Sequence, residues 1–144
     1  MTSVTVAPAS AATAELLAAF HRLIPQLSSS STPISTDQLA EMIAAESTTI
    51  FVATKEQEIV GLLTLVIFRI PTGVRAWIED VVVDESARGH GVGEALNRAA
   101  LDDARRKGAK TVDLTSRPSR AAANRLYQRL GFVARETNVY RYEL

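Results

Sequence analysis

The chain has 144 residues, of which 47% are hydrophobic and 22% charged, as in an ordinary globular protein, and this length predicts one domain over residues 1–144. Sixteen basic side chains balance sixteen acidic ones and no apolar run approaches the roughly 20 residues of a membrane helix, so we expect neither a nucleic acid nor a membrane as a partner. The lack of cysteine excludes disulfides and a thiol nucleophile, and two histidines are too few for a typical metal cluster, so we expect no metal.

The first third of the chain predicts a strand followed by two helices. Residues 4–7 resemble a short strand, and residues 11–23 place apolar side chains at helical spacing until Pro25, which we expect to end the helix. A run of serine and threonine over residues 28–33 predicts a loop, and Ser35 with Gln38 forms a capping box for a second, short helix. The first ten residues lack the basic start and apolar stretch of a secretory signal, so we expect a cytoplasmic protein.

The rest of the chain alternates between strands and helices. β-Branched and aromatic residues over 50–54 and 59–70 predict a hairpin, and a strand over 77–84 leads into a glycine-rich turn. A helix follows until Gly108, then a strand over 111–115, a helix that ends at Gly131, and one or two closing strands over 132–144. This order predicts an α/β domain with a mixed sheet.

The turn over residues 88–93 has the sequence Arg-Gly-His-Gly-Val-Gly. Its three glycines allow positive φ, so that successive amide N–H groups can converge on one anion at the positive end of the helix dipole, and Arg88 adds a fixed charge. The spacing is not G-x-G-x-x-G, because Glu94 stands at the sixth position from Gly89, and the P-loop pattern is absent. A phosphate-bearing ligand is indicated, although a glycine-rich turn alone is equally typical of a tight structural turn.

This turn resembles the signature of the GNAT superfamily of N-acetyltransferases, R/Q-x-x-G-x-G/A after a strand, which Arg88, Gly91 and Gly93 match. Residues 124–132 look like a second family pattern, N-x-x-x-x-Y or A-x-x-x-Y-x-x-x-G-F. The resemblance covers most of the chain by element order and is specific over residues 77–132. It implies an α/β fold with about four helices and a mixed, mostly antiparallel twisted sheet, splayed open near Asp84 and Thr111 by a central cleft that holds acetyl-CoA.

The resemblance also implies roles for individual residues. Backbone groups in the strand would bind the pantetheine arm and the oxyanion, and amides of the turn would hold the pyrophosphate. Asn124 matches an asparagine that contacts the cofactor arm, and Tyr127 matches the general acid that returns a proton to the departing thiolate. The cofactor-binding residues implied in this way are Val81, Val82, Val83, Arg88, Gly89, His90, Gly91, Val92, Gly93, Glu94, Asn124 and Tyr127.

A general base is required, because an amine with a pKa near ~10.4 is mostly protonated at neutral pH. Glu79 is the candidate, since it stands in the strand that would line the acetyl group, and the acidic pair Glu79 and Asp80 is costly to bury without a partner. Alternation places these two side chains on opposite faces unless a bulge intervenes. The alternatives for Glu79 are an ion pair with an arginine such as Arg75 and a position at the exposed edge of the sheet.

The sequence therefore predicts an acetyl-CoA-dependent N-acetyltransferase that acts by direct attack of a primary amine, with general base and general acid assistance. The acceptor is expected to be a small molecule, and protein lysine or N-terminal amines are the alternative. A non-catalytic acyl-CoA-binding regulatory module is the second interpretation. The presence of Glu79 and Tyr127 discriminates between the enzyme and the module, because a module would be free to lose both residues. The resemblance also allows a homodimer, because family members often dimerise.

Overall fold

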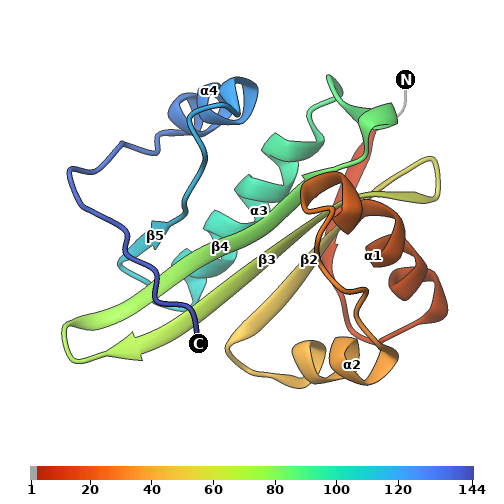
Figure 1. The fold of residues 1–144 in the computed structure, drawn as a ribbon, viewed down its shortest axis with the longest axis horizontal. Coiled ribbons are helices and arrows are strands. Elements are labelled where there is room, and N and C mark those ends of the chain that lie inside the picture. The colour runs from red at the N-terminus through yellow and green to blue at the C-terminus, as the bar shows by residue number, and fades with distance from the viewer. Residues whose placement is uncertain (1–2) are drawn as a thin grey trace.

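The computed structural model describes residues 3–144 and folds them into a five-stranded sheet with four helices (Figure 1). β1 (Val4–Pro8) is followed by α1 (Ala14–Leu27), α2 (Thr36–Ala44), β2 (Thr48–Lys55), β3 (Glu58–Ile70) and β4 (Gly73–Val83). A short 3-10 helix, η1 (Glu85–Ala87), then leads to α3 (Val92–Arg106), β5 (Thr111–Asp113) and α4 (Ala121–Leu130). Within the described range, no helix is long and apolar enough to cross a membrane. The expectations for the first ten residues and for a domain over 1–144 include residues 1 and 2, which lie outside this range.

The strands lie in sequence order across the sheet, and only the last pairing, between β4 and β5, is parallel. This parallel ladder is short, because it joins residues 75–77 to residues 111–113 and then stops. β4 continues to Val83, so its last six residues have no partner strand on the β5 side among the described strands. The predicted mixed, mostly antiparallel sheet that is splayed open between these two strands is thereby confirmed.

Alternating side chains divide the core into two clusters, one on each face of the sheet. Phe51 and Leu63 pack in the cluster that contains α3, whereas their chain neighbours Ile50 and Leu62 pack in the cluster that contains α1 and α2. The sheet therefore separates α3 on one face from α1 and α2 on the other.

A β-bulge interrupts this alternation at the splayed end of β4. Leu62 lies opposite Val82 and Thr64 lies opposite Glu79, so β4 has one residue more than β3 between these two pairs. The residue after Glu79, Asp80, has a φ of 50°, in the left-handed region that few side chains adopt. The bulge that would release Glu79 and Asp80 from strict alternation is thus present.

The bulge moves the following side chains to the other face of the sheet. Ile78 packs in the cluster of α3, but Val82, an even number of positions later, packs in the cluster of α1 and α2. Glu79 and Asp80 are both exposed at this point. The expected cost of burying an acidic pair therefore does not arise, and that argument for a catalytic Glu79 is wrong.

Two expectations about secondary structure are wrong, one for the end of the first helix and one for the strands that were to close the chain. Pro25 does not end the first helix but lies inside α1, because the bond lost with its missing N–H is close to the helix end, and the Ser28 N–H still bonds to the Ile24 carbonyl at 2.9 Å. The closing strands expected over 132–144 are absent from the described chain, because no neighbouring strand pairs with this segment. The capping box of Ser35 and Gln38 is confirmed.

Gly61 on β3 lets α3 approach the sheet closely. A Cβ at this position would stand 2.8 Å from Val92 Cγ1 and 3.0 Å from Leu96 Cδ1, both on α3. Gly61→Ala should therefore lower the free energy of unfolding by about 1–3 kcal/mol, the usual cost of overpacking, as measured by urea denaturation. Adding Val92→Ala removes the nearest methyl, so the double variant should be less destabilised than the sum of the single variants. Strict additivity would contradict this contact.

Candidate functional site

The turn between η1 and α3 contains two glycines in the left-handed conformation. Gly89 has a φ of 83° and Gly91, which caps α3, has a φ of 78°. A Cβ at either position would meet no atom within 4 Å, so the backbone conformation, and not close packing, requires glycine here. The turn is open on this side, and Arg88 and His90 are exposed beside it. Such a turn at a helix N-terminus can direct successive N–H groups at an anion.

Gly93 serves a different purpose in the first turn of α3. A Cβ there would stand only 3.1 Å from Leu126 Cδ2, so the missing side chain lets α4 lie against α3. Glu94 adds an ion pair across the same junction, with its Oε1 3.5 Å from Arg129 Nη2, while its Oε2 accepts a 3.3 Å bond from Arg98 Nε. These contacts join α4 directly to the glycine turn.

Tyr127 is the buried aromatic residue of α4. Its side chain is 8% exposed, and its ring meets that of Phe132 edge-on, with 5.7 Å between the centroids. Burial raises the pKa of Tyr127 above its ordinary value of about 10, and the positive charge of Arg120 lowers it in part. The phenol is therefore protonated at neutral pH, which is the state that a proton donor requires.

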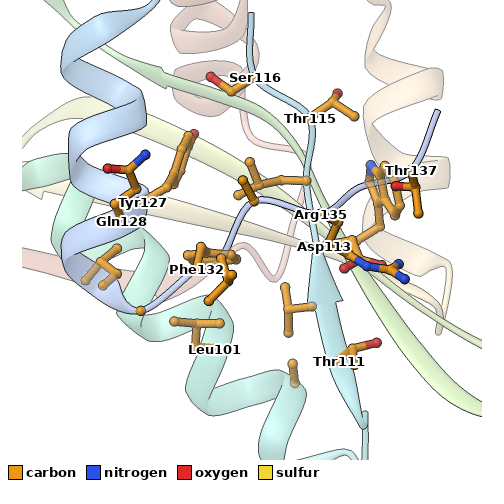
Figure 2. A pocket seen from close by; sticks show the side chains of 18 of the residues that line it. Leu101, Thr111, Asp113, Thr115, Ser116, Tyr127, Gln128, Phe132, Arg135 and Thr137 are labelled. Carbon is orange, nitrogen blue, oxygen red and sulfur yellow. The ribbon is translucent and has the colours of Figure 1, made fainter. Parts of the chain in front are cut away.

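A cavity of about 810 Å³ lies between α4, β5 and residues 132–139 (Figure 2). Tyr127 and Asn124 line it from α4, together with Trp77 of β4. Figure 2 shows Tyr127 projecting from α4 toward the chain that follows β5. Of the residues expected at the site, only Asn124 and Tyr127 line this cavity, whereas those of β4 and of the glycine turn lie outside its lining.

Asn124 is half-buried near the start of α4. Its side-chain Nδ2 donates a 3.0 Å hydrogen bond to the carbonyl of Arg117, which ties α4 to the loop that precedes it. Its Oδ1 accepts no hydrogen bond from the residues that the structure describes, so this atom is available to a donor group of a ligand. The expected contact between Asn124 and the cofactor arm stays a prediction.

Glu79 and Tyr127 lie on different faces of the sheet. Ile78 packs toward α3, so alternation directs the next side chain, that of Glu79, to the face of α1 and α2. Tyr127 lies on the opposite side, because its ring meets that of Phe132, which packs against the cluster of α3. Within residues 3–144, Glu79 forms no ion pair, and Arg75 donates instead to Thr72 Oγ1 at 3.2 Å. The alternative in which Arg75 pairs with Glu79 is therefore wrong.

Sequence reasoning missed Gly61, Trp77 and Arg129, which shape the site from β3, β4 and α4. Trp77 carried a signal, because it is the one tryptophan of the chain and stands at the start of the predicted strand. Nothing in the sequence distinguishes Arg129 from Arg125, the other arginine of its helix, since its partner Glu94 is 35 positions away.

Gly89 and Gly108 offer a matched test of the turn. Both have a φ of 83° with no atom within 4 Å of an added Cβ, but Gly108 lies at the other end of α3. Gly89→Ala and Gly108→Ala should each lower the free energy of unfolding by about 1–2 kcal/mol, because alanine disfavours this conformation. Only Gly89→Ala should also weaken acetyl-CoA binding, by about tenfold or more in isothermal titration calorimetry. Equal affinities of the two variants would argue against an anion site at the turn.

The model of the Acetyltransferase (GNAT) family matches residues 14–132 of the chain, which is most of its length. A putative acetyltransferase from Agrobacterium tumefaciens str. C58 is 27% identical, with a TM-score of 0.85 over 96% of this chain and 99% of that one. A transcriptional regulator from Bacillus halodurans C-125 is 26% identical, with a TM-score of 0.80 over 98% of this chain and 100% of that one.

An aminoglycoside N-acetyltransferase in complex with CoA is 17% identical, with a TM-score of 0.83 over 99% of this chain and 96% of that one, which shows the likeness of the fold alone. No curated protein matches the chain. The family model covers the splayed strands, the glycine turn and the helix of Tyr127 together. The chain therefore belongs to the GNAT family of acetyltransferases.

Proposed function

We propose that the chain, as one N-acetyltransferase domain over residues 1–144, transfers the acetyl group of acetyl-CoA to a primary amine of a small molecule. Membership of the acetyltransferase family supports the acyl transfer. One observation supports the assignment of the site most strongly: the open, left-handed glycine turn contacts, through Gly93 and Leu126, the helix that carries the protonated Tyr127. The proposed anion site and the proposed proton donor therefore lie on two helices, α3 and α4, that pack against each other.

The chain offers two backbone surfaces to a phosphorylated thioester. The amides from Gly89 to Glu94 face an open region at the start of α3 and would hold the pyrophosphate. The end of β4, including Val81 and Val83, has no partner strand on the β5 side among the described strands, so its backbone is free to bond an extended arm as a neighbouring strand would. A neighbour of the same fold carries CoA, which supports this donor. Acetyl-CoA supplies an activated acyl group.

Glu79 and Tyr127 each carry out one proton transfer in the proposed reaction, from opposite faces of the sheet. Glu79 accepts a proton from the ammonium group of the acceptor, directly or through a water molecule, on the face of α1 and α2. The amine nitrogen then forms the C–N bond while the C–S bond breaks, and a backbone N–H near Val82 stabilises the oxyanion. Tyr127 gives its proton to the departing sulfur on the face of α3 and α4, and the second proton that the nitrogen loses as the amide forms restores the phenol through solvent. Transfer from a phenol of pKa above 10 to a thiolate whose conjugate acid has a pKa of ~8.5 costs at least about 2 kcal/mol, which an enzymatic step tolerates.

A non-catalytic acyl-CoA-binding regulatory module is the second candidate function. The neighbour described as a transcriptional regulator, at 26% identity, favours it. The two functions differ in turnover: acetyl-CoA binding without acetyl transfer to any member of a broad amine library, including peptides with free lysine and N-terminal amines, would support the module. Transfer to peptides but not to small amines would instead support a protein acceptor.

Four further expectations from the sequence remain predictions. They are that the protein binds neither nucleic acid nor a membrane, that it holds no metal, that it is cytoplasmic and that it can form a homodimer.

Tyr127→Phe should lower turnover by about 10²–10⁴-fold, because it removes the proton donor while keeping the ring that packs on Phe132. The dissociation constant of acetyl-CoA should change little, since the hydroxyl acts on the departing sulfur. The raised pKa of Tyr127 predicts that turnover of the wild-type protein loses this contribution only above about pH 10, as the phenol ionises, and that the variant lacks this alkaline loss. Unchanged turnover, measured by thiol release against pH, would contradict the role.

Glu79→Gln should lower turnover at neutral pH by about 10²-fold or more, because the amide cannot accept the proton of the ammonium group. The loss should shrink as pH rises and the free amine becomes abundant. Asp80→Asn is the matched control, since Asp80 is the exposed neighbour at the bulge and asparagine tolerates the left-handed conformation. Equal losses in the two variants would point to a general effect of charge and would remove Glu79 as the base.

A further inference from the structure

The cavity beside Tyr127 is much larger than an acetyl group. Its volume of about 810 Å³ lies within the range of about 300–1,000 Å³ that holds a drug-sized ligand. An acetyl group adds only a methyl group to the carbonyl of the thioester and would fill a small part of this space. Because Tyr127 must come within hydrogen-bond reach of the sulfur to act as the acid, the acyl group of the donor would begin next to the cavity.

The cavity also lies at the end of the path proposed for the cofactor arm. The pyrophosphate would bind at residues 89–94, beyond the end of β4, and the arm would follow the backbone of Val83 and Val81 toward the start of that strand. The last pair of the ladder between β4 and β5 is Trp77 with Asp113, and both residues line the cavity. In the proposed complex, the acyl end of the donor would therefore point toward the cavity.

The walls of the cavity on the side of Tyr127 are apolar. The ring of Phe132 meets that of Tyr127 edge-on, and Figure 2 shows Phe132 close to Leu101 of α3. Val112 and Leu114 pack against the core cluster of α3 and line the same cavity. These four apolar side chains are only half-buried, so a hydrocarbon chain in contact with them would remove further apolar surface from water.

The other side of the cavity is polar and charged. Figure 2 shows Asp113, Arg135 and Thr137 on the side away from Tyr127. A hydrocarbon chain that reached these groups would displace their water without replacing its hydrogen bonds, which is unfavourable. The apolar walls therefore favour an acyl chain of medium length over a long one.

We propose that the donor site accepts straight-chain acyl groups longer than acetyl, and that their chains lie in this cavity against Phe132 and Leu101. This inference rests on the proposed function, because it uses the same thioester site and the same general acid. The transfer is otherwise unchanged: the amine nitrogen bonds to the acyl carbon, the C–S bond breaks, CoA leaves as the thiol, and the protons move as in acetyl transfer. The product is the amide of a longer carboxylic acid.

Isothermal titration calorimetry with acetyl-CoA, butyryl-CoA and hexanoyl-CoA tests the inference. Affinity should rise by about twofold to fourfold for each methylene that leaves water, so hexanoyl-CoA should bind at least about tenfold more tightly than acetyl-CoA. Thiol release with one amine acceptor should show that all three acyl groups are transferred.

The outcomes separate this inference from the proposed function. If acetyl-CoA binds and its acetyl group is transferred, but the longer thioesters bind no more tightly or are not transferred, the inference is overturned and the proposed function stands. If none of the three thioesters binds, both are overturned.

Leu101→Trp tests whether the cavity itself holds the chain. The larger side chain would fill the space beside Phe132, so the advantage of hexanoyl-CoA over acetyl-CoA in affinity should fall by about tenfold. Val133→Trp is a second variant with the same expected direction and little risk to folding, because Val133 lines the cavity but is 83% exposed. Circular dichroism checks that each variant is folded.

Leu17→Trp is the matched control. Leu17 is also a half-buried leucine of a helix, but it packs in the core cluster on the opposite face of the sheet. This variant should keep the full advantage of hexanoyl-CoA. An equal loss in Leu17→Trp and Leu101→Trp, or an unchanged advantage in both Leu101→Trp and Val133→Trp, would overturn the inference.

Discussion

β4 contains one residue more than β3 between Glu79 and Val82, and the left-handed conformation of Asp80 absorbs it. The short parallel ladder with β5 has already ended at residue 77, so the bulge lies where β4 stands alone on that side. Because the ladder ends there, the backbone of β4 beyond residue 77 is unpaired on the side of β5. The bulge also changes the face of the sheet to which the following side chains of β4 point. The proposed base, Glu79, and the proposed acid, Tyr127, then lie on opposite faces of the sheet.

The parts of the site that the sequence predicted are those governed by local conformation. The glycine turn could be predicted because a positive φ at Gly89 and Gly91 depends on a few neighbouring residues, and the helix of Tyr127 could be predicted because its apolar stripe has helical spacing. The splayed sheet was predicted from the resemblance to the family and not from the residue pattern, since no residue of β5 indicates that its ladder with β4 ends after three positions.

The wrong predictions share a physical cause, which is that they depend on contacts distant in the sequence. The bulge at Asp80 follows from the register with β3, so local alternation could not locate it. The tail after Phe132 alternates as a strand does, but a strand also needs a partner, and none is present in the described chain. Pro25 stays inside α1 because the helix packs on the sheet through Leu16, Phe20 and Leu23, and this burial outweighs one missing hydrogen bond near the helix end.

The contact between α3 and α4 links the glycine turn to the helix that carries Tyr127. Glu94 and Arg129 form an ion pair there, but both side chains are well exposed, at 37% and 64%, so this pair contributes little to stability. The close approach of Leu126 to Gly93 is the firmer link, because packed groups resist displacement. Leu126 directly precedes Tyr127, and Gly93 lies two residues after the left-handed Gly91. In the proposed reaction, binding energy gained at the glycine turn would therefore act on the same rigid junction that positions the phenol, so interactions remote from the reacting bond would orient the proposed proton donor.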